Sequence, residues 1–129
     1  MRDYYRLVTS MDLGVGRVLD ALAKHGVDEN TVILFTSDNG HFKGEHGLAG
    51  KWLMYDPSLR VPGFVYDPRT EPTRERTDSP VITTDFSVTM LALAGLPKPA
   101  DMTGADLMPL LSTEPADWRT DVLYEEVNR

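Results

Sequence analysis

The feature that most constrains the fold is a continuous apolar run, TVILFT, from Thr31 to Thr36. The run is rich in β-branched residues and does not alternate with polar ones. Such runs are typical of a strand that is covered on both faces within a parallel sheet. It ends at Ser37-Asp38-Asn39-Gly40, whose residue types favour a tight turn. We therefore expect a buried strand followed directly by a turn.

Other elements surround this strand. Apolar residues from Tyr4 to Leu22 recur every three or four positions, which predicts an amphipathic helix, and Gly26 is placed to cap its end. Further elements are expected at Val61–Tyr66 (strand), Val81–Thr83 (strand), from Thr84 or Asp85 to Leu93 (helix), Thr103–Leu111 (turn and helix) and Val122–Val127 (strand). The order indicates an α/β fold. Since sheets usually hold about 4–6 strands, the pattern indicates a piece of a larger domain.

Composition excludes several classes of function. The chain has 129 residues, a net charge of −7 and no cysteine. The acidic balance argues against nucleic acid and anionic membrane surfaces as partners. Without cysteine there is no disulfide framework, zinc knuckle or cysteine nucleophile. No apolar run approaches the ~20 residues of a membrane span, and the sequence from Met1 does not read as an export signal.

The turn after the strand is the first candidate site. Ligands of open α/β sheets gather beyond the carboxyl ends of the strands. Asp38 and Asn39 offer hard oxygen atoms there, which suit Ca²⁺ or Mg²⁺. An ordinary Asx turn that closes a strand is the alternative for these residues.

The following loop adds five ionisable side chains within eleven residues, spaced by glycines: His41, Lys43, Glu45, His46 and Lys51. Histidines can bind a metal or transfer protons near neutral pH, and a lysine can hold a sulfate or phosphate oxygen. The alternative is a solvated loop. The glycines match no phosphate-binding motif, and no G-x-S-x-G elbow supports a serine hydrolase.

The stretch Thr31 to Trp52, TVILFTSDNGHFKGEHGLAGKW, resembles the C-terminal half of the catalytic domain of the sulfatase family. The likeness continues in the helix before it, in Ser58-Leu59-Arg60-Val61-Pro62, in Thr84-Asp85 through Ala94-Gly95-Leu96, and in Gly104 to Leu111. It implies an α/β fold: a partial alkaline-phosphatase-like sandwich with a mostly parallel sheet and flanking helices, truncated at both ends. Residues 1–112 would belong to the catalytic domain, and residues 113–129 would begin a small C-terminal subdomain.

The resemblance also implies roles for single residues. Asp38 and Asn39 match the pair that binds a divalent cation, usually Ca²⁺ with Mg²⁺ as the alternative. Lys51 matches the lysine that contacts the sulfate group. His46 is a weaker catalytic candidate near the substrate, and His41 is the weakest.

The chain also departs from the family. The family's nucleophile is a formylglycine made from Cys or Ser in C/S-x-P-x-R, and this chain has no such motif. The formylglycine, the paired aspartates of the metal site and the upstream catalytic histidine and lysine are expected in an N-terminal part outside this sequence. Gly63 stands where a larger apolar residue is usual, at some cost in packing.

The function implied is hydrolysis of sulfate esters by the full-length parent, on a sulfated small molecule or glycan, with the isolated chain inactive. Two alternatives stay open: a phosphonate or phosphodiester hydrolase of the same superfamily, and a non-catalytic half that pairs with another subunit. Expected partners include an N-terminal half or a second copy, but neither nucleic acid nor membrane. A periplasmic or secreted location would suit the parent.

Overall fold

The structure is a computed structural model that describes residues 2–51, 53–71, 76–112, 115 and 117–125. It divides into two compact units. The first contains Met1–Ile33 and Val65–Glu71, and the second contains Leu34–Phe64 and Pro72–Arg129. Trp52 and the end of the proposed strand at Val127 lie outside the described residues. The domain boundary at residue 112 stays a prediction.

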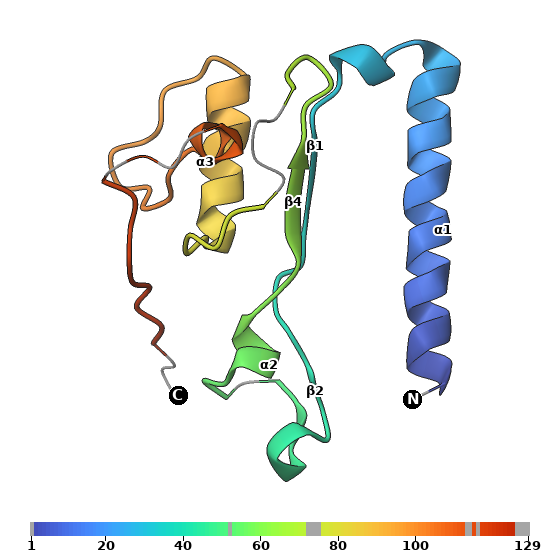
Figure 1. Ribbon diagram of the computed structural model, residues 1–129, viewed down its shortest axis with the longest axis vertical. Helices are drawn as coiled ribbons and strands as arrows, with labels where there is room; N and C mark the ends of the chain where they lie inside the picture. Colours follow the sequence, from blue (N-terminus) through green and yellow to red (C-terminus); the bar gives the residue numbers. More distant parts are fainter. Residues whose placement is uncertain (1, 52, 72–75, 113–114, 116, 126–129) are drawn as a thin grey trace. The chain divides into compact units, whose positions relative to one another are not determined.

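The first unit is dominated by α1 (Arg2–His25), which confirms the predicted amphipathic helix (Figure 1). Gly26 ends it with φ of 64°, a left-handed conformation that glycine adopts without strain. The backbone N–H groups of Gly26 and Val27 donate to the carbonyls of Ala23 and Leu22, as in a Schellman motif. A short 3₁₀ turn, η1 (Asp28–Asn30), follows. In the described part of the chain, no helix combines the length and the apolar character needed to cross a bilayer.

An ion pair in the same unit, just after β4 (Gly63–Tyr66), joins the buried Asp67 to the exposed Arg69. The Arg69 guanidinium donates from Nε to Asp67 Oδ1 at 2.8 Å and from Nη2 to Oδ2 at 2.7 Å. The Arg69 backbone N–H donates to Oδ1 as well, at 3.0 Å. These hydrogen bonds, the side-chain ones foremost, lower the pKa of Asp67 below its ordinary value of 3.8, although burial opposes them.

This pair predicts an acid-sensitive contribution to stability. Because the folded-state pKa is depressed, the contribution is complete above pH 3.8 and is lost as the pH falls through the folded pKa. Urea unfolding followed by circular dichroism should show Asp67→Asn less stable than the wild type at pH 7. The difference should shrink at pH 3 and below. A difference that does not change with pH would show that the carboxylate's charge is not what Arg69 stabilises.

β1 (Ile33–Thr36) pairs with β4, which confirms two predicted strands. Figure 1 shows the chain leaving β1, turning back through β2 (Phe42–Lys43) and α2 (Asp56–Leu59), and returning beside β1 as β4. The rings of Phe35 and Phe64 stack at 4.8 Å, and Thr36 Oγ1 donates to the Pro62 carbonyl. Ile33 to Phe35 are only half-buried, not covered on both faces as expected, because β4 is the one strand paired with β1 in the described residues.

The core of the second unit gathers around α3 (Thr83–Leu93) and a 3₁₀ turn, η3 (Met108–Leu111). Its buried residues on these two segments and just before η3 are Asp85, Phe86, Val88, Thr89, Leu107 and Leu110. Thr89 Oγ1 donates to the Asp85 carbonyl and accepts from the Leu107 N–H, so a hydroxyl ties the two segments together. The helix ends at Leu93, as predicted, and Gly95 follows it with φ of 68°.

Gly63 corrects one expectation. A Cβ at this position would lie 3.1 Å from Phe86 Cζ, so the aromatic ring of α3 occupies the space beside the glycine. The small residue therefore leaves no packing loss here. It admits Phe86, which is buried. A Cβ at Gly63 would require the Phe86 ring to shift by a few tenths of an ångström.

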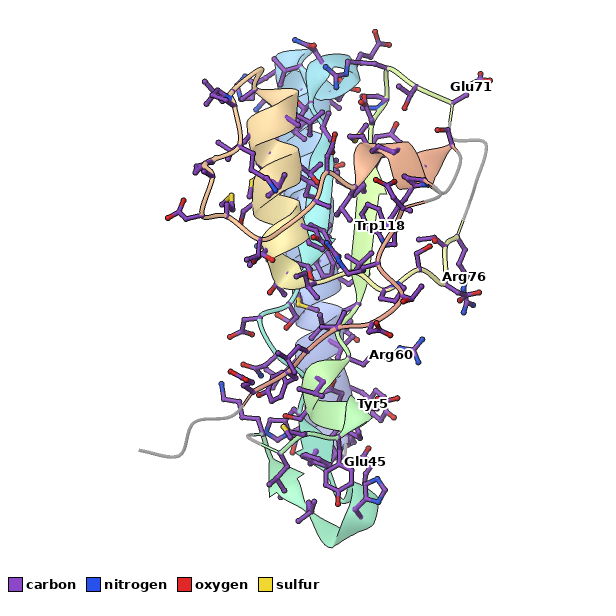
Figure 2. The ribbon with its side chains drawn as sticks, turned by 90° about the vertical axis from the view of Figure 1, so that its left-hand side faces the viewer. Tyr5, Glu45, Arg60, Glu71, Arg76 and Trp118 are labelled. Atoms are coloured by element: carbon purple, nitrogen blue, oxygen red, sulfur yellow. The ribbon has the colours of Figure 1, made fainter. Side chains whose placement is uncertain are left out.

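Asp85 is fully buried, and its carboxylate accepts four hydrogen bonds. Its Oδ2 accepts from Ile82 N at 2.8 Å and from Arg119 Nη1 at 2.5 Å. Its Oδ1 accepts from Ala105 N at 2.8 Å and from Arg119 Nη2 at 2.7 Å. Hydrogen bonding to this carboxylate raises the pKa of Arg119 above its ordinary value. The neighbouring Trp118, labelled in Figure 2, donates from Nε1 to the Pro80 carbonyl.

Three predictions near this cluster were wrong. Val81–Thr83 is not a strand: residues 81 and 82 have no regular structure, and Thr83 begins α3. The Ile82 N–H is taken by the Asp85 side chain, so it cannot join a sheet ladder. Asp85 is the third residue of the helix and not its N-cap, which is Ile82. Residues 122–125 form no strand either.

Candidate active site

The turn at the end of β1 is held by its own side chains. Ser37 Oγ donates to the Asn39 carbonyl at 3.1 Å, and Asn39 N donates to Asp38 Oδ1 at 2.9 Å. Asn39 Nδ2 donates to the Gly40 carbonyl at 2.8 Å. None of these three contacts is the hydrogen bond of an Asx turn, in which an Asp or Asn side chain accepts from the N–H two residues on; the side chains here bond their immediate neighbours and the Asn39 carbonyl. These contacts leave the exposed Asp38 carboxylate at the carboxyl end of the strand.

Gly40 is required by a close backbone approach. Its N–H donates to the Ser58 carbonyl at 2.7 Å, within α2 (Asp56–Leu59). A Cβ on Gly40 would lie 2.1 Å from the Pro57 carbonyl oxygen, which is well inside van der Waals contact. Only glycine therefore lets α2 pack against the turn, a contact that sequence analysis did not foresee.

Gly40→Ala should thus destabilise the protein by at least about 1–3 kcal/mol, the usual cost of overpacking. Gly14→Ala is the matched control, because a Cβ at this helical position meets nothing within 4 Å. That control should be neutral or stabilising, since alanine favours a helix by about 1 kcal/mol over glycine. Thermal unfolding of both variants checks the pair. Equal melting temperatures would show that α2 does not hold the turn.

A two-stranded hairpin returns the chain to the turn. β2 (Phe42–Lys43) pairs antiparallel with β3 (Ala49–Gly50), with Phe42 opposite Gly50. In this register Lys51 returns to the base of the hairpin, beside the residues that precede β2. Its Nζ donates to Asn39 Oδ1 at 2.9 Å across twelve residues of sequence. The structure therefore brings together three sequence-predicted site residues, Asp38, Asn39 and Lys51.

The two histidines lie elsewhere on this hairpin. His46 is at the tip, exposed, in a left-handed conformation with φ of 56°. Its ring lies 4.8 Å from that of Tyr55, which also contacts the buried Phe42 ring at 6.0 Å. His41 is exposed at the base and forms no hydrogen bond, ion pair or ring contact with the described residues.

The tip of the hairpin is fixed by a carboxylate. Glu45, labelled in Figure 2 at the 3₁₀ turn η2 (Glu45–Gly47), accepts a hydrogen bond from the Lys43 backbone N–H at 2.5 Å. This bond lowers the pKa of Glu45 below its ordinary value of 4.5, with smaller help from the Glu45 N–H and nearby positive charges. Glu45 thus orders the loop that ends at Lys51.

The donor atoms suit a hard cation, but they are few. Asp38 and Asn39 contribute carboxylate and amide oxygens, which Ca²⁺ and Mg²⁺ prefer. Asn39 Oδ1 already accepts from Lys51. Within the described ranges, no three His, Cys, Asp or Glu side chains cluster closely enough to hold a metal. A cation that takes about 6–8 oxygens would need most of its ligands from outside these residues.

Comparison with known proteins identifies the family. The Sulfatase family model matches residues 1–96. The chain is 39% identical over 127 residues to an N-acetylglucosamine-6-O-sulfatase of Bacteroides thetaiotaomicron, covering 96% of this chain and 23% of that protein. It is 34% identical over 126 residues to an arylsulfatase of Clostridium perfringens, covering 95% of this chain and 26% of that protein. The chain thus spans about a quarter of the length of these curated relatives.

Solved structures agree with this. A structure in complex with its substrate, D-glucosamine-2-N,6-O-disulfate, superposes with a TM-score of 0.79 at 40% identity, covering 92% of this chain and 25% of the other. A phosphonate monoester hydrolase of Agrobacterium radiobacter superposes with a TM-score of 0.83 at 31% identity, covering 90% and 23%. Both the family model and the relatives show that the chain belongs to the sulfatase family, within the alkaline-phosphatase-like superfamily.

Proposed function

We propose that this chain supplies the sulfate-binding lysine and one corner of the cation site of a sulfuric ester hydrolase. The observation that carries the proposal is the hydrogen bond of 2.9 Å between Lys51 Nζ and Asn39 Oδ1, next to the Asp38 carboxylate. It places a positive charge and two hard oxygen donors at the carboxyl end of β1. A sulfate ester needs such an arrangement, because negative charge on its oxygens must be neutralised.

Each residue has a separate task in this proposal. Asp38 and Asn39 would hold Ca²⁺, with Mg²⁺ as the alternative, together with acidic residues from outside this chain. When bound, the cation supplies Lewis-acid polarisation of a sulfuryl oxygen. Lys51 orients the sulfate group and stabilises charge on its remaining oxygens. His46 and His41 stay weaker candidates for contacts with the rest of the substrate.

The nucleophile is the missing component. The 129 residues contain no cysteine and no serine in an S-x-P-x-R motif, so the formylglycine of the family would come from outside them. Without it the chain has no means of covalent catalysis, and Lys51 can only stabilise charge. We therefore expect the isolated chain to hydrolyse no sulfate ester.

Sulfated amino sugars are the first substrates to test for the whole protein. The Bacteroides relative is an N-acetylglucosamine-6-O-sulfatase, and a structure with 40% identity holds a disulfated glucosamine. The similarity to a phosphonate monoester hydrolase supports a second candidate, cleavage of phosphonate esters at the same site. A Caenorhabditis elegans relative, 35% identical over 127 residues, is named a putative extracellular sulfatase, which supports an exported location, periplasmic or secreted.

A chimera tests the proposal. The matching segment of the Bacteroides relative would be replaced by this chain, and the chimera assayed with N-acetylglucosamine-6-sulfate and with 4-nitrophenyl phenylphosphonate. We expect release of sulfate that stops with EDTA and returns with Ca²⁺, and a lower kcat/KM for the phosphonate. A folded chimera that prefers the phosphonate ester would favour the second candidate. A folded chimera without any turnover would favour a non-catalytic role.

A further inference from the structure

We propose that Tyr55 is a positioning residue, whose aromatic ring holds Lys51 in place against Asn39. Tyr55 lies between Lys51 and α2 in the chain. The inference rests on the proposed function, because only there does Lys51 act on a sulfate group. Its test therefore includes a structural readout that needs no turnover.

The Tyr55 ring contacts two parts of the hairpin. Its centroid lies 6.0 Å from that of Phe42 in β2, and the two rings meet edge to face at 77°. It lies 4.8 Å from the centroid of the His46 ring at the tip, with the ring planes tilted by 30°. Rings at about 4.5–7 Å attract one another in such arrangements. One side chain thus contacts both the strand that begins the hairpin and the turn at its tip.

The contact with Phe42 leads to Lys51 through the strand pairing. Phe42 is buried, and it lies opposite Gly50 in the pairing of β2 with β3. Lys51 follows Gly50 directly in the chain. A displacement of Phe42 would therefore displace the point at which the lysine leaves the hairpin.

The backbone of Tyr55 connects the same residue to α2 and to the turn after β1. Tyr55 is the N-cap residue of α2, and its carbonyl accepts from the N–H groups of Ser58 and Leu59 at 2.8 and 3.1 Å. The Ser58 carbonyl accepts from the Gly40 N–H at 2.7 Å. Gly40 follows Asn39, so α2 links Tyr55 to the turn that contains the proposed cation ligands.

A continuous path of contacts therefore runs from Asn39 through α2 and the Tyr55 ring to β2, β3 and Lys51. The two ends of the path meet in the hydrogen bond of 2.9 Å between Lys51 Nζ and Asn39 Oδ1. One hydrogen bond adds little net stability, and ordering a lysine side chain costs conformational entropy. The ring contacts of Tyr55 hold the hairpin so that this bond can form.

The backbone of the hairpin tip is a second reason to assign this role to Tyr55. His46 has a φ of 56°, a left-handed conformation that residues other than glycine rarely adopt. Such conformations persist where surrounding contacts hold them. The ring of Tyr55 is one such contact, and the hydrogen bond from the Lys43 N–H to Glu45 is another.

The alternative is that Tyr55 contacts the substrate through its hydroxyl. That hydroxyl forms no hydrogen bond in the described part of the chain, whereas the ring makes both contacts given above. Tyr55→Phe separates the two roles, because it removes the hydroxyl and keeps the ring.

A double-mutant cycle in the chimera with the Bacteroides relative tests the inference. We expect Tyr55→Ala to lower kcat for N-acetylglucosamine-6-sulfate by about tenfold or more, because small displacements of a charge-stabilising group are costly. In a Lys51→Ala background the same change should alter kcat by less than about twofold, since Tyr55 acts through the lysine. Tyr55→Phe should restore kcat to within about twofold of the wild type. Tyr124→Ala is the matched control, because Tyr124 belongs to the same unit and makes no ring contact with the described residues.

Two kinetic results would overturn the inference. If Tyr55→Ala lowers kcat by the same factor with and without Lys51, its effect is a general loss of folded protein and not a displaced lysine. If Tyr55→Phe is as slow as Tyr55→Ala, the hydroxyl acts on the substrate directly.

Nuclear magnetic resonance of the full 129-residue chain supplies the readout that needs no turnover. The side-chain amide of Asn39 reports its bond to Lys51, and Lys51→Ala marks the resonance position without that bond. We expect Tyr55→Ala to move the Asn39 resonance toward this position and Tyr124→Ala to leave it unchanged. An Asn39 resonance that stays in place in Tyr55→Ala would refute the positioning role. The expected shift, together with a wild-type chimera that releases no sulfate, would contradict only the proposed function.

Discussion

Asp85→Ala should lower the free energy of unfolding by about 3–5 kcal/mol, the cost of removing one partner from a buried ion pair. The substitution leaves the Arg119 guanidinium without its carboxylate partner, and the Arg119 side chain is only 21% exposed. It also leaves the N–H groups of Ile82 and Ala105 without their acceptor. Each unsatisfied buried group adds its own desolvation cost. We expect the segment around Arg119 to lose its attachment to α3.

Urea unfolding measures the effect, and the chain offers a matched control. Asp78 forms a hydrogen-bonded ion pair of 2.8 Å with Arg76, but both side chains are at least 75% exposed. Asp78→Ala should therefore change stability by less than about 1 kcal/mol. The loss of stability in Asp85→Asn should lie between those of Asp85→Ala and Asp78→Ala. The amide keeps one oxygen that can accept a hydrogen bond, but its NH₂ group faces the N–H donors around it. Equal losses for Asp85→Ala and Asp78→Ala would contradict the role assigned to burial.

The ion pair of Asp85 with Arg119 could not be predicted from the sequence. Asp85 reads locally as a helix-capping residue, and it does accept a hydrogen bond from the start of α3. Its other partners are Ala105 and Arg119, 20 and 34 residues away. Periodicity and turn statistics describe neighbours along the chain, so they cannot reveal such contacts. The family resemblance pointed to Thr84-Asp85 but not to the pairing of Asp85 with Arg119.

The elements that were predicted correctly are those with strong local signals. α1 has a sustained helical repeat and a terminal glycine, and β1 comes from an uninterrupted apolar run rich in β-branched residues. The Val81–Thr83 segment has the composition of a strand, yet a side-chain hydrogen bond from Asp85 commits it to the start of a helix. Here a specific local contact outweighed β propensity.

The candidate site was predicted from residue types and from the resemblance, whereas its geometry was not. Two-residue strands give no periodic signal, so the hairpin that returns Lys51 to Asn39 could not be read from the sequence. Nor could the approach of α2 to Gly40, which depends on the backbone. The positions of His46 against Tyr55 and of His41 at the hairpin base likewise emerge only in three dimensions.

Lys51→Ala has the largest expected effect on activity. In the chimera with the Bacteroides relative, kcat/KM for a sulfate ester should fall by about 10²-fold or more, the usual cost of losing one preorganised charge-stabilising donor. Lys43→Ala is the control, since it removes an exposed lysine from the same hairpin, and it should change kcat/KM by less than about twofold.

Cation binding separates the two roles that Lys51 could have. Its ammonium lies 2.9 Å from Asn39 Oδ1, one of the oxygens proposed to hold Ca²⁺. Removing that positive charge frees the oxygen and reduces repulsion of the cation, so Ca²⁺ should bind as tightly as in the wild type or more tightly. Calorimetric titration with Ca²⁺ measures this directly. Slow turnover with intact Ca²⁺ binding would place Lys51 at the sulfate group, whereas weakened Ca²⁺ binding would show that the lysine instead holds Asn39 in position for the metal.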